Sequence, residues 1–193
     1  MNVMPYIIPV STIVIPSIVF FLQFQKRELL LKTIKPIFWL TALLLFSYAG
    51  ILSYFQYQAF QSGPLSYTIG TVDGLKYFFS YARFHFWNTY LVSFIVALLL
   101  FWVSAYLDKK RGQVHFEHDE LYIIALGILI TGYPAFLFYI VLVLLLAAIS
   151  SALLVKKNER LPLYYFWMPS AIITTLLVAL WAGNQGWWAS FRF

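Results

Sequence analysis

The chain has no cysteine among its 193 residues, and this absence excludes several kinds of site. Without thiols it forms no disulfide, no thiolate zinc or iron–sulfur centre, and no cysteine nucleophile. Charged side chains are scarce as well, at 10% of the residues, whereas 62% are hydrophobic and the mean hydropathy is +0.81. A soluble domain of this size needs more polar surface than that. The composition therefore predicts an integral membrane protein with a single transmembrane domain over residues 1–193.

The sequence contains several long apolar runs. A helix needs about 20 apolar residues to cross roughly 30 Å of hydrocarbon. The runs of this chain predict an all-α, polytopic membrane fold of about six transmembrane helices. These spans are expected near residues 4–24, 36–57, 86–107, 120–133, 135–155 and 163–182. Residues 59–84 are only weakly hydrophobic and are predicted as a loop outside the membrane, with a re-entrant loop that dips inward or a further span as the alternatives.

Residues 121–155 form one apolar run that is too long for a single straight span. The sequence "GYP" at residues 132–134 interrupts it, and basic residues flank it on both sides. Flanks of the same charge on one side of a membrane require an even number of crossings. The run is therefore predicted to be a compact helical hairpin whose first arm is short.

Basic side chains are concentrated in three loops. Such loops remain on the cytosolic side, so the basic loops are expected in the cytosol and both termini outside. The formal charge of +6 is explained by these loops and their attraction to lipid headgroups, and the sequence contains no nucleic-acid module. The basic residues of the three loops are Lys26, Arg27, Lys32, Lys35, Lys109, Lys110, Arg111, Lys156, Lys157 and Arg160.

Asp119 lies at the start of a predicted span and is followed by a series of short sequence motifs. Asp119 opens "DELYIIALG", with Gly127 eight residues later, and "TGYPAF", a long apolar helix, "KKNER" and "LPLYYFW" follow, including Pro162 and Phe166. In this order and spacing, residues 86–182 resemble the aspartic prepilin leader peptidases, the family of the type IV pilin and preflagellin signal peptidases. The resemblance implies the helix order of that family in the second half of the chain, and a place in a bacterial or archaeal cytoplasmic membrane. It also implies a membrane aspartic endopeptidase that needs no cofactor and cleaves pilin-like precursors at the cytosolic membrane face.

The chain departs from the pattern of that family at several motif positions. Phe116 and His118 stand where the family has two glycines before its aspartate. Gln56 and Gln58 lie near the place of its second, upstream aspartate, and neither side chain ionises. The resemblance therefore implies a divergent relative, either active or inactive.

An aspartic peptidase needs two carboxylates that are close enough to share a proton. One acts as the base toward the attacking water and the other as the acid toward the carbonyl oxygen. In this chain Asp119 would supply one carboxylate. Asp73, or Asp108 in its place, would supply the other.

Other interpretations of the same acids remain open. His115 and His118 are candidate ligands for a metal ion, although a zinc site needs three or four protein ligands. Asp119 equally suits the first turn of a helix, where an acid caps free N–H groups, and Asp73 before Gly74 is typical of a turn. The protein is accordingly either a relative of the prepilin peptidases that cleaves or binds pilin-like precursors, or a non-catalytic subunit or scaffold of a larger membrane complex.

Overall fold

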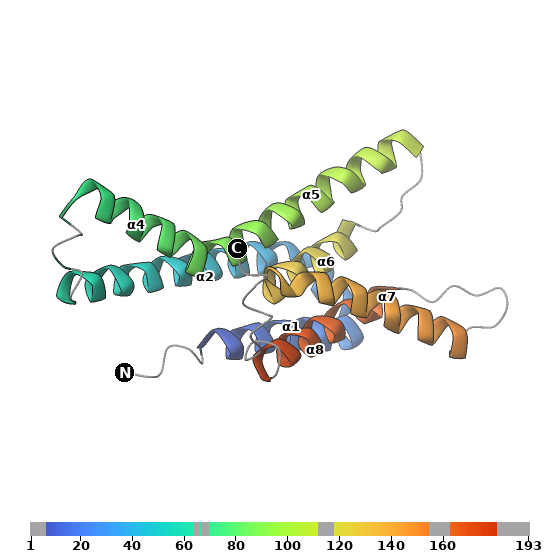
Figure 1. Ribbon diagram of the computed structural model, residues 1–193. Helices are drawn as coiled ribbons and strands as arrows, with labels where there is room; N and C mark the ends of the chain where they lie inside the picture. The colour runs from blue at the N-terminus through green and yellow to red at the C-terminus, as the bar shows by residue number, and fades with distance from the viewer. Residues whose placement is uncertain (1–6, 64–65, 67–69, 112–117, 155–162, 181–193) are drawn as a thin grey trace.

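The computed structural model describes residues 7–63, 66, 70–111, 118–154 and 163–180, which are almost entirely helical (Figure 1). Apolar residues in long unbroken runs form these helices, because a helix satisfies all of its own backbone hydrogen bonds in an apolar medium. The elements are α1 (Ile7–Gln25), α2 (Arg27–Ser62), α4 (Val72–Ala82), the π-helical turn η2 (Arg83–Trp87), α5 (Asn88–Arg111), α6 (His118–Thr131), α7 (Ala135–Leu154), the 3-10 turn η3 (Leu163–Phe166) and α8 (Trp167–Leu180).

Four helical stretches of the described chain are long and apolar enough to cross a membrane. They are Arg27–Ser62, Val72–Leu107, Ala135–Ala152 and Leu163–Leu180. Two further apolar helices are shorter, at Thr12–Gln25 and Glu120–Thr131. The prediction of an all-α protein with several membrane-spanning helices is therefore confirmed at this level.

Residues 59–84 were predicted as a loop, and the described part of this segment is mostly helical. α2 continues to Ser62, and α4 leads through η2 into α5 without an interruption. Thr71 caps the start of α4, because its hydroxyl oxygen accepts a hydrogen bond from the Gly74 N–H at 3.1 Å. The loop prediction is wrong because the glycines of this segment weaken its apolar pattern, whereas contacts with α2 stabilise the helix.

Aromatic rings hold α4 against the second half of α2. The ring of Phe78 lies 5.2 Å from that of Tyr57, and the ring of Tyr81 lies 5.7 Å from that of Phe60. At the base of this pair, the Trp87 indole N–H donates to the Ser53 hydroxyl at 2.9 Å. Edge-to-face contacts of this kind each stabilise a pair by about 1 kcal/mol. Figure 1 shows α4 and α5 meeting at an angle where η2 joins them.

The core of the molecule is built around α6. This helix packs against α1, α2, α5, α7 and α8. A helix that is apolar all round is expected to be enclosed by protein or lipid, and here the enclosure is by protein. Its fully or nearly buried residues are Leu121, Ile123, Ile124, Ala125, Leu126, Ile128, Leu129 and Ile130.

The turn between α6 and α7 occupies the predicted break at residues 132–134. Gly132 adopts a φ of 70°, which a residue with a side chain rarely adopts. The Tyr133 N–H donates to the Thr89 carbonyl of α5 at 3.2 Å, and the Phe136 N–H donates to the Gly132 carbonyl at 2.8 Å. The protein itself thus satisfies the backbone groups of the turn, as an apolar environment requires.

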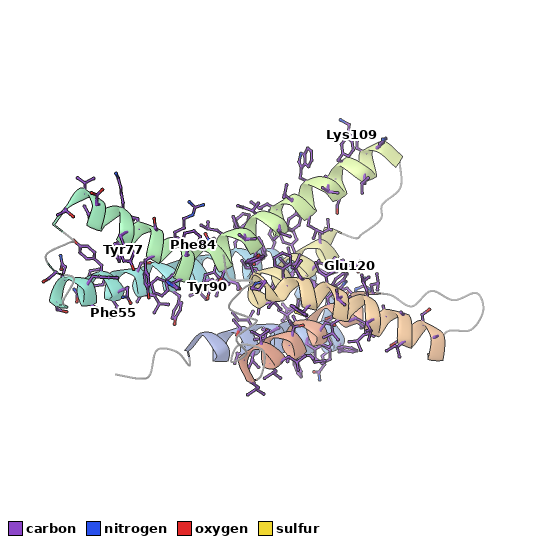
Figure 2. The ribbon with its side chains drawn as sticks, viewed as in Figure 1. Phe55, Tyr77, Phe84, Tyr90, Lys109 and Glu120 are labelled. Atoms are coloured by element: carbon purple, nitrogen blue, oxygen red, sulfur yellow. The ribbon has the colours of Figure 1, made fainter. Side chains whose placement is uncertain are left out.

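The helix ends next to the basic residues lie together at one end of the molecule, which we call the basic end. Gln23, near the end of α1, donates from Nε2 to the Tyr164 carbonyl of η3 at 2.5 Å. The Arg27 guanidinium at the start of α2 lies over the Tyr164 ring, 5.6 Å from its centroid. Figure 2 places Lys109 of α5 and Glu120 of α6 toward this same end.

Candidate functional site

Asp119 is the second residue of α6, at the basic end. It therefore lies in the first helical turn, where an acid interacts favourably with the positive end of the helix dipole. The side chains of Asp108, His118 and Asp119 and the whole of His115 lie outside the described part of the structure. The position of Asp119 in the chain of α6 thus fits a helix start at the basic end.

The structure does not bring Asp73 near the start of α6. Thr89 of α5 is hydrogen-bonded to Tyr133, directly after the end of α6. From this Thr89–Tyr133 contact, about 20 Å of helix leads back along α6 to Asp119. About 24 Å of helix leads from the same contact in the other direction, through η2 and α4, to Asp73. The two aspartates are therefore on the order of 40 Å apart along the helices, and Figure 2 places Tyr77, one turn after Asp73, at the opposite end from Glu120.

Asp73 forms an exposed ion pair with a residue of its own helix. Its carboxylate lies 3.7 Å from the Lys76 ammonium, one turn along α4, and its side chain is 96% exposed. An exposed pair of this kind contributes little to stability. Asp73 is thus a solvated residue in the first turn of a helix.

Asp108 lies in the last turn of α5, at the same end of the molecule as Asp119. α5 and α6 run antiparallel, and the rings of Phe101 and Tyr122 lie 4.7 Å apart between them. The ends of the two helices that carry Asp108 and Asp119 are consequently the adjoining ones. Asp108 and Asp119 are therefore the two predicted acids that lie at the same end of the molecule.

Glu120 has a defined partner that sequence reasoning missed. Its Oε1 accepts a hydrogen bond of 3.0 Å from the Trp167 indole N–H, which ties the start of α6 to the start of α8. Trp167 is buried, with 7% of its surface exposed, and its ring also lies 6.1 Å from that of Tyr139 in α7. The signal in the sequence was the tryptophan that ends "LPLYYFW", but nothing linked it to an acid 47 residues earlier.

Gly127 and Tyr139 form the closest packing of α6 against α7. A Cβ atom added to Gly127 would overlap the hydroxyl and the ring of Tyr139. The Tyr139 side chain is fully buried, and its hydroxyl has no hydrogen-bond partner in the described structure. The resemblance pointed to Gly127 for its spacing from Asp119, and the structure gives it this packing role.

Replacing Tyr139 by phenylalanine is expected to raise the stability of the protein slightly. A buried hydroxyl without a partner costs about 1–3 kcal/mol of desolvation, and phenylalanine removes it while keeping the ring. Thermal unfolding of the purified protein, followed by tryptophan fluorescence, would measure the change. A marked loss of stability would mean that the hydroxyl has an acceptor, and this would contradict the expectation.

No group of three metal-ligating side chains occurs in the part of the chain that the structure describes. The metal hypothesis for His115 and His118 falls on side chains outside that part. It stays a hypothesis on the sequence.

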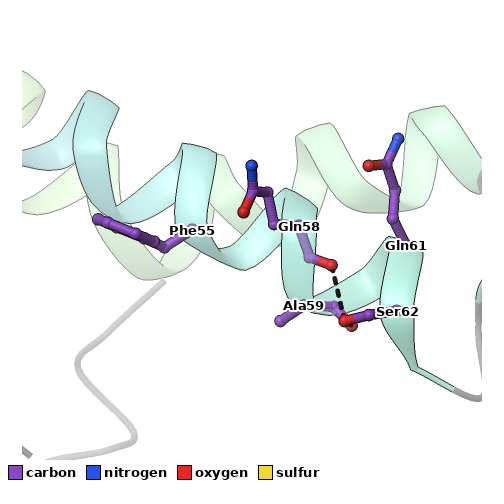
Figure 3. A pocket seen from close by; sticks show the side chains of 5 residues that line it. All are labelled: Phe55, Gln58, Ala59, Gln61 and Ser62. Carbon is purple, nitrogen blue, oxygen red and sulfur yellow. Dashed lines mark hydrogen bonds between the residues drawn. The ribbon is translucent and has the colours of Figure 1, made fainter. Parts of the chain in front are cut away.

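A groove of about 350 Å³ lies near the end of α2 (Figure 3). The basic end is at the other end of this helix, where Arg27 begins it. All five lining residues come from this one helix, and they are Phe55, Gln58, Ala59, Gln61 and Ser62. Their polar groups largely serve the helix, since the Ser62 hydroxyl donates to the Gln58 carbonyl at 3.0 Å and the Gln58 amide donates to Tyr54 at 2.6 Å. The groove holds no carboxylate and therefore lacks the chemistry of an aspartic peptidase.

Comparisons with protein-family models, with curated proteins and with solved structures found no match.

Proposed function

We propose that this protein is a prepilin-peptidase-like integral membrane protein that binds a pilin-like precursor without cleaving it. In this proposal the chain crosses the membrane six times, with α1 and α6 as the two short spans. The basic end faces the cytosol, as the positive-inside rule favours. The precursor would reach the protein from that side, since this is where the related peptidases act on their substrates.

The distance between Asp73 and the start of α6 is the observation that carries this proposal, because it removes one of the two acids predicted as partners of Asp119 and leaves only Asp108. Proton sharing between two acids requires carboxylates in near contact, and about 40 Å of helix separates these two. Glu120, the described acid nearest to Asp119, is hydrogen-bonded to Trp167. The basic end therefore presents a surface of acidic and basic side chains to a precursor, at the end of a tightly packed helix bundle.

The Asp119→Asn variant is expected to leave processing of a pilin-like precursor unchanged. Membranes with the wild-type protein or this variant would be incubated with a precursor from the same source, and leader removal would be measured by mass spectrometry. Removing a catalytic carboxylate costs on the order of 10²–10⁴-fold in rate. Asp73→Asn is the matched control at the far end of the molecule.

Two outcomes of that assay would contradict the proposal. Leader removal by the wild-type protein that is lost in Asp119→Asn and in Asp108→Asn would establish a peptidase with that pair of acids. A precursor that is neither cleaved nor crosslinked to the wild-type protein would exclude binding. The expected result is a precursor that keeps its leader and crosslinks to the wild type and to Asp73→Asn, and that crosslinks less to Asp108→Asn and Asp119→Asn.

The second candidate function is a non-catalytic subunit or scaffold of a larger membrane complex. The broad exposed face of α5 favours it, because Ile95, Trp102 and Tyr106 each expose more than half of their surface. Lipid or a neighbouring helix would cover such a face. Photo-crosslinkers on this face that repeatedly capture the same residues of one membrane protein would favour the scaffold over the precursor-binding function.

A further inference from the structure

The outer side of α5 carries a continuous row of exposed residues that ends in two lysines. The small residues Ser93, Ala97 and Ser104 lie on the opposite side of this helix, where they are buried. Residues three or four positions apart share one side of a helix, so the exposed residues form one row along it. We call this row the α5 stripe, and it contains Ile95, Leu98, Trp102, Tyr106, Lys109 and Lys110.

Along the α5 stripe the exposed side chains change from aliphatic to aromatic and then to cationic. After the aliphatic part, Trp102 exposes 69% of its surface and Tyr106 exposes 54%. Their rings are stacked, with centroids 6.2 Å apart and an angle of 17° between the planes. Lys109 and Lys110 follow within about one turn, and both are exposed. The remaining exposed side chains described on α5 are aliphatic and precede the lysines, so none of them interrupts this order; they are Leu91, Leu99, Val103 and Ala105.

The lengths of these parts match one leaflet of a bilayer. Ile95 and Tyr106 are about 16 Å apart along the helix, which is about half of the 30 Å hydrocarbon layer. Tyr106 and Lys110 are about 6 Å apart, the thickness of about one headgroup layer. Tryptophan and tyrosine are enriched where these two layers meet, and this is the place of the stacked rings in the α5 stripe.

α2 places its own change from cationic to apolar side chains at the same level. The rings of Phe38 and Phe101 lie 6.1 Å apart and mark a common height on α2 and α5. Lys109 lies about 12 Å from this contact along α5, and Lys32 lies about 9 Å from it along α2, both toward the basic end. Residues 36–62 of α2 contain no charged side chain. Two helices thus agree within about one turn on where the apolar surface ends, and Figure 2 shows Lys109 at that end of α5.

We propose that the α5 stripe binds one anionic phospholipid of the leaflet at the basic end. Lys109 and Lys110 bind its phosphate, the stacked rings cover its glycerol region, and the aliphatic part of the stripe contacts its acyl chains. The sequence "DKKR" at residues 108–111 has three cations and one acid, which favours an anionic headgroup. The same cations disfavour a second copy of the chain, because copies inserted in the same direction would bring like charges together. This site does not depend on the binding of a precursor.

Native mass spectrometry of the purified protein tests the preference for an anionic headgroup. Phosphatidylglycerol or phosphatidylcholine would be added, and the lipid retained by each protein molecule would be counted. The wild type is expected to retain more phosphatidylglycerol, since each cation near an anionic lipid contributes about fivefold in affinity. The double variant Lys109→Gln and Lys110→Gln is expected to retain at least about fivefold less of it, with phosphatidylcholine unchanged.

The matched control removes two exposed cations at the other end of the same helical stretch, with Lys76→Gln and Arg83→Gln. This variant is expected to retain phosphatidylglycerol like the wild type. An equal loss in both double variants would indicate general charge attraction, and equal retention of the two lipids by the wild type would exclude a preference; either result overturns the proposal. Unchanged retention after loss of Lys109 and Lys110 would place the headgroup elsewhere. Displacement of the lipid by soluble glycerol phosphate would indicate a site for a free phosphate group and would also overturn it.

Single cysteines test what covers the α5 stripe, since the chain has no cysteine of its own. Spin labels at Leu98→Cys and Lys110→Cys would be studied in vesicles of phosphatidylcholine and phosphatidylglycerol. Collisions with oxygen are expected at 98, and collisions with a water-soluble nickel complex at 110. Nickel contact at 98 equal to that at 110 would place the stripe in water, and contact with neither reagent at 98 would mean that protein covers it. Disulfide-linked dimers of Trp102→Cys would identify a second copy as the cover, and each of these three results would contradict a lipid site.

Discussion

Replacing Gly127 by alanine is expected to lower the free energy of unfolding by about 2–3 kcal/mol, a typical cost of overpacking a tight core. The added methyl group would overlap the hydroxyl and ring of Tyr139. Tyr139 is fully buried, so its ring has no solvent to move into. Thermal unfolding in detergent, together with the yield of monodisperse protein, would measure the loss.

Gly50→Ala is the matched control for this change. Gly50 also lies inside a helix, but a Cβ atom there would meet nothing within 4 Å. Alanine is a better helix former than glycine by about 1 kcal/mol, so this variant should be neutral or slightly more stable. Combining Gly127→Ala with Tyr139→Phe should recover part of the loss, because the nearest overlapping atom is removed. Equal stability of Gly127→Ala and the wild type would contradict the close contact.

Replacing Glu120 by alanine is expected to cost about 2 kcal/mol, the usual range for a hydrogen bond to a charged group. The change leaves the buried Trp167 N–H without the acceptor that it has at 3.0 Å. It also separates the start of α6 from the start of α8, so the basic end should loosen first. Hydrogen exchange of the first turns of both helices would localise the effect, and thermal unfolding would measure its size.

Glu120→Gln distinguishes the hydrogen bond from the charge, since its amide oxygen still accepts from Trp167. This variant should lose much less stability than Glu120→Ala. A double-mutant cycle with Trp167→Phe should give a coupling energy of about 1–2 kcal/mol, as expected for residues in direct contact. A coupling energy near zero would contradict the interaction.

The sequence predicted those parts of the fold that depend on composition. A long run without charge, such as that of α7, has no stable alternative to a helix in lipid, and the break at residues 132–134 lies where Gly132 needs a positive φ. The extension of α2 to Ser62 and the helix α4 were not predicted, because glycines and polar residues dilute the apolar pattern there. Ring contacts between segments about 20 residues apart decide their structure, and no local pattern reports such contacts.

The candidate site was predictable only in its position. Asp119 follows the basic loop and begins a buried helix, and both features are visible in the sequence. The partner of the acid beside it was not, since Glu120 and Trp167 meet only after α8 has packed on α6. The choice of Asp73 as a second carboxylate rested on a loop that would bend back toward the membrane. The helix of α4 directs Asp73 away from the basic end.

The enclosure of α6 has a consequence for biosynthesis. With 14 residues, this helix reaches about 21 Å and is too short to partition into lipid by itself. It is therefore expected to leave the insertion machinery together with α7, as one hairpin that the long apolar run of α7 carries into the bilayer. α8 is made last of these helices and closes over both. Until then the newly made α6 would be exposed on one side, where it is open to quality-control proteases of the membrane.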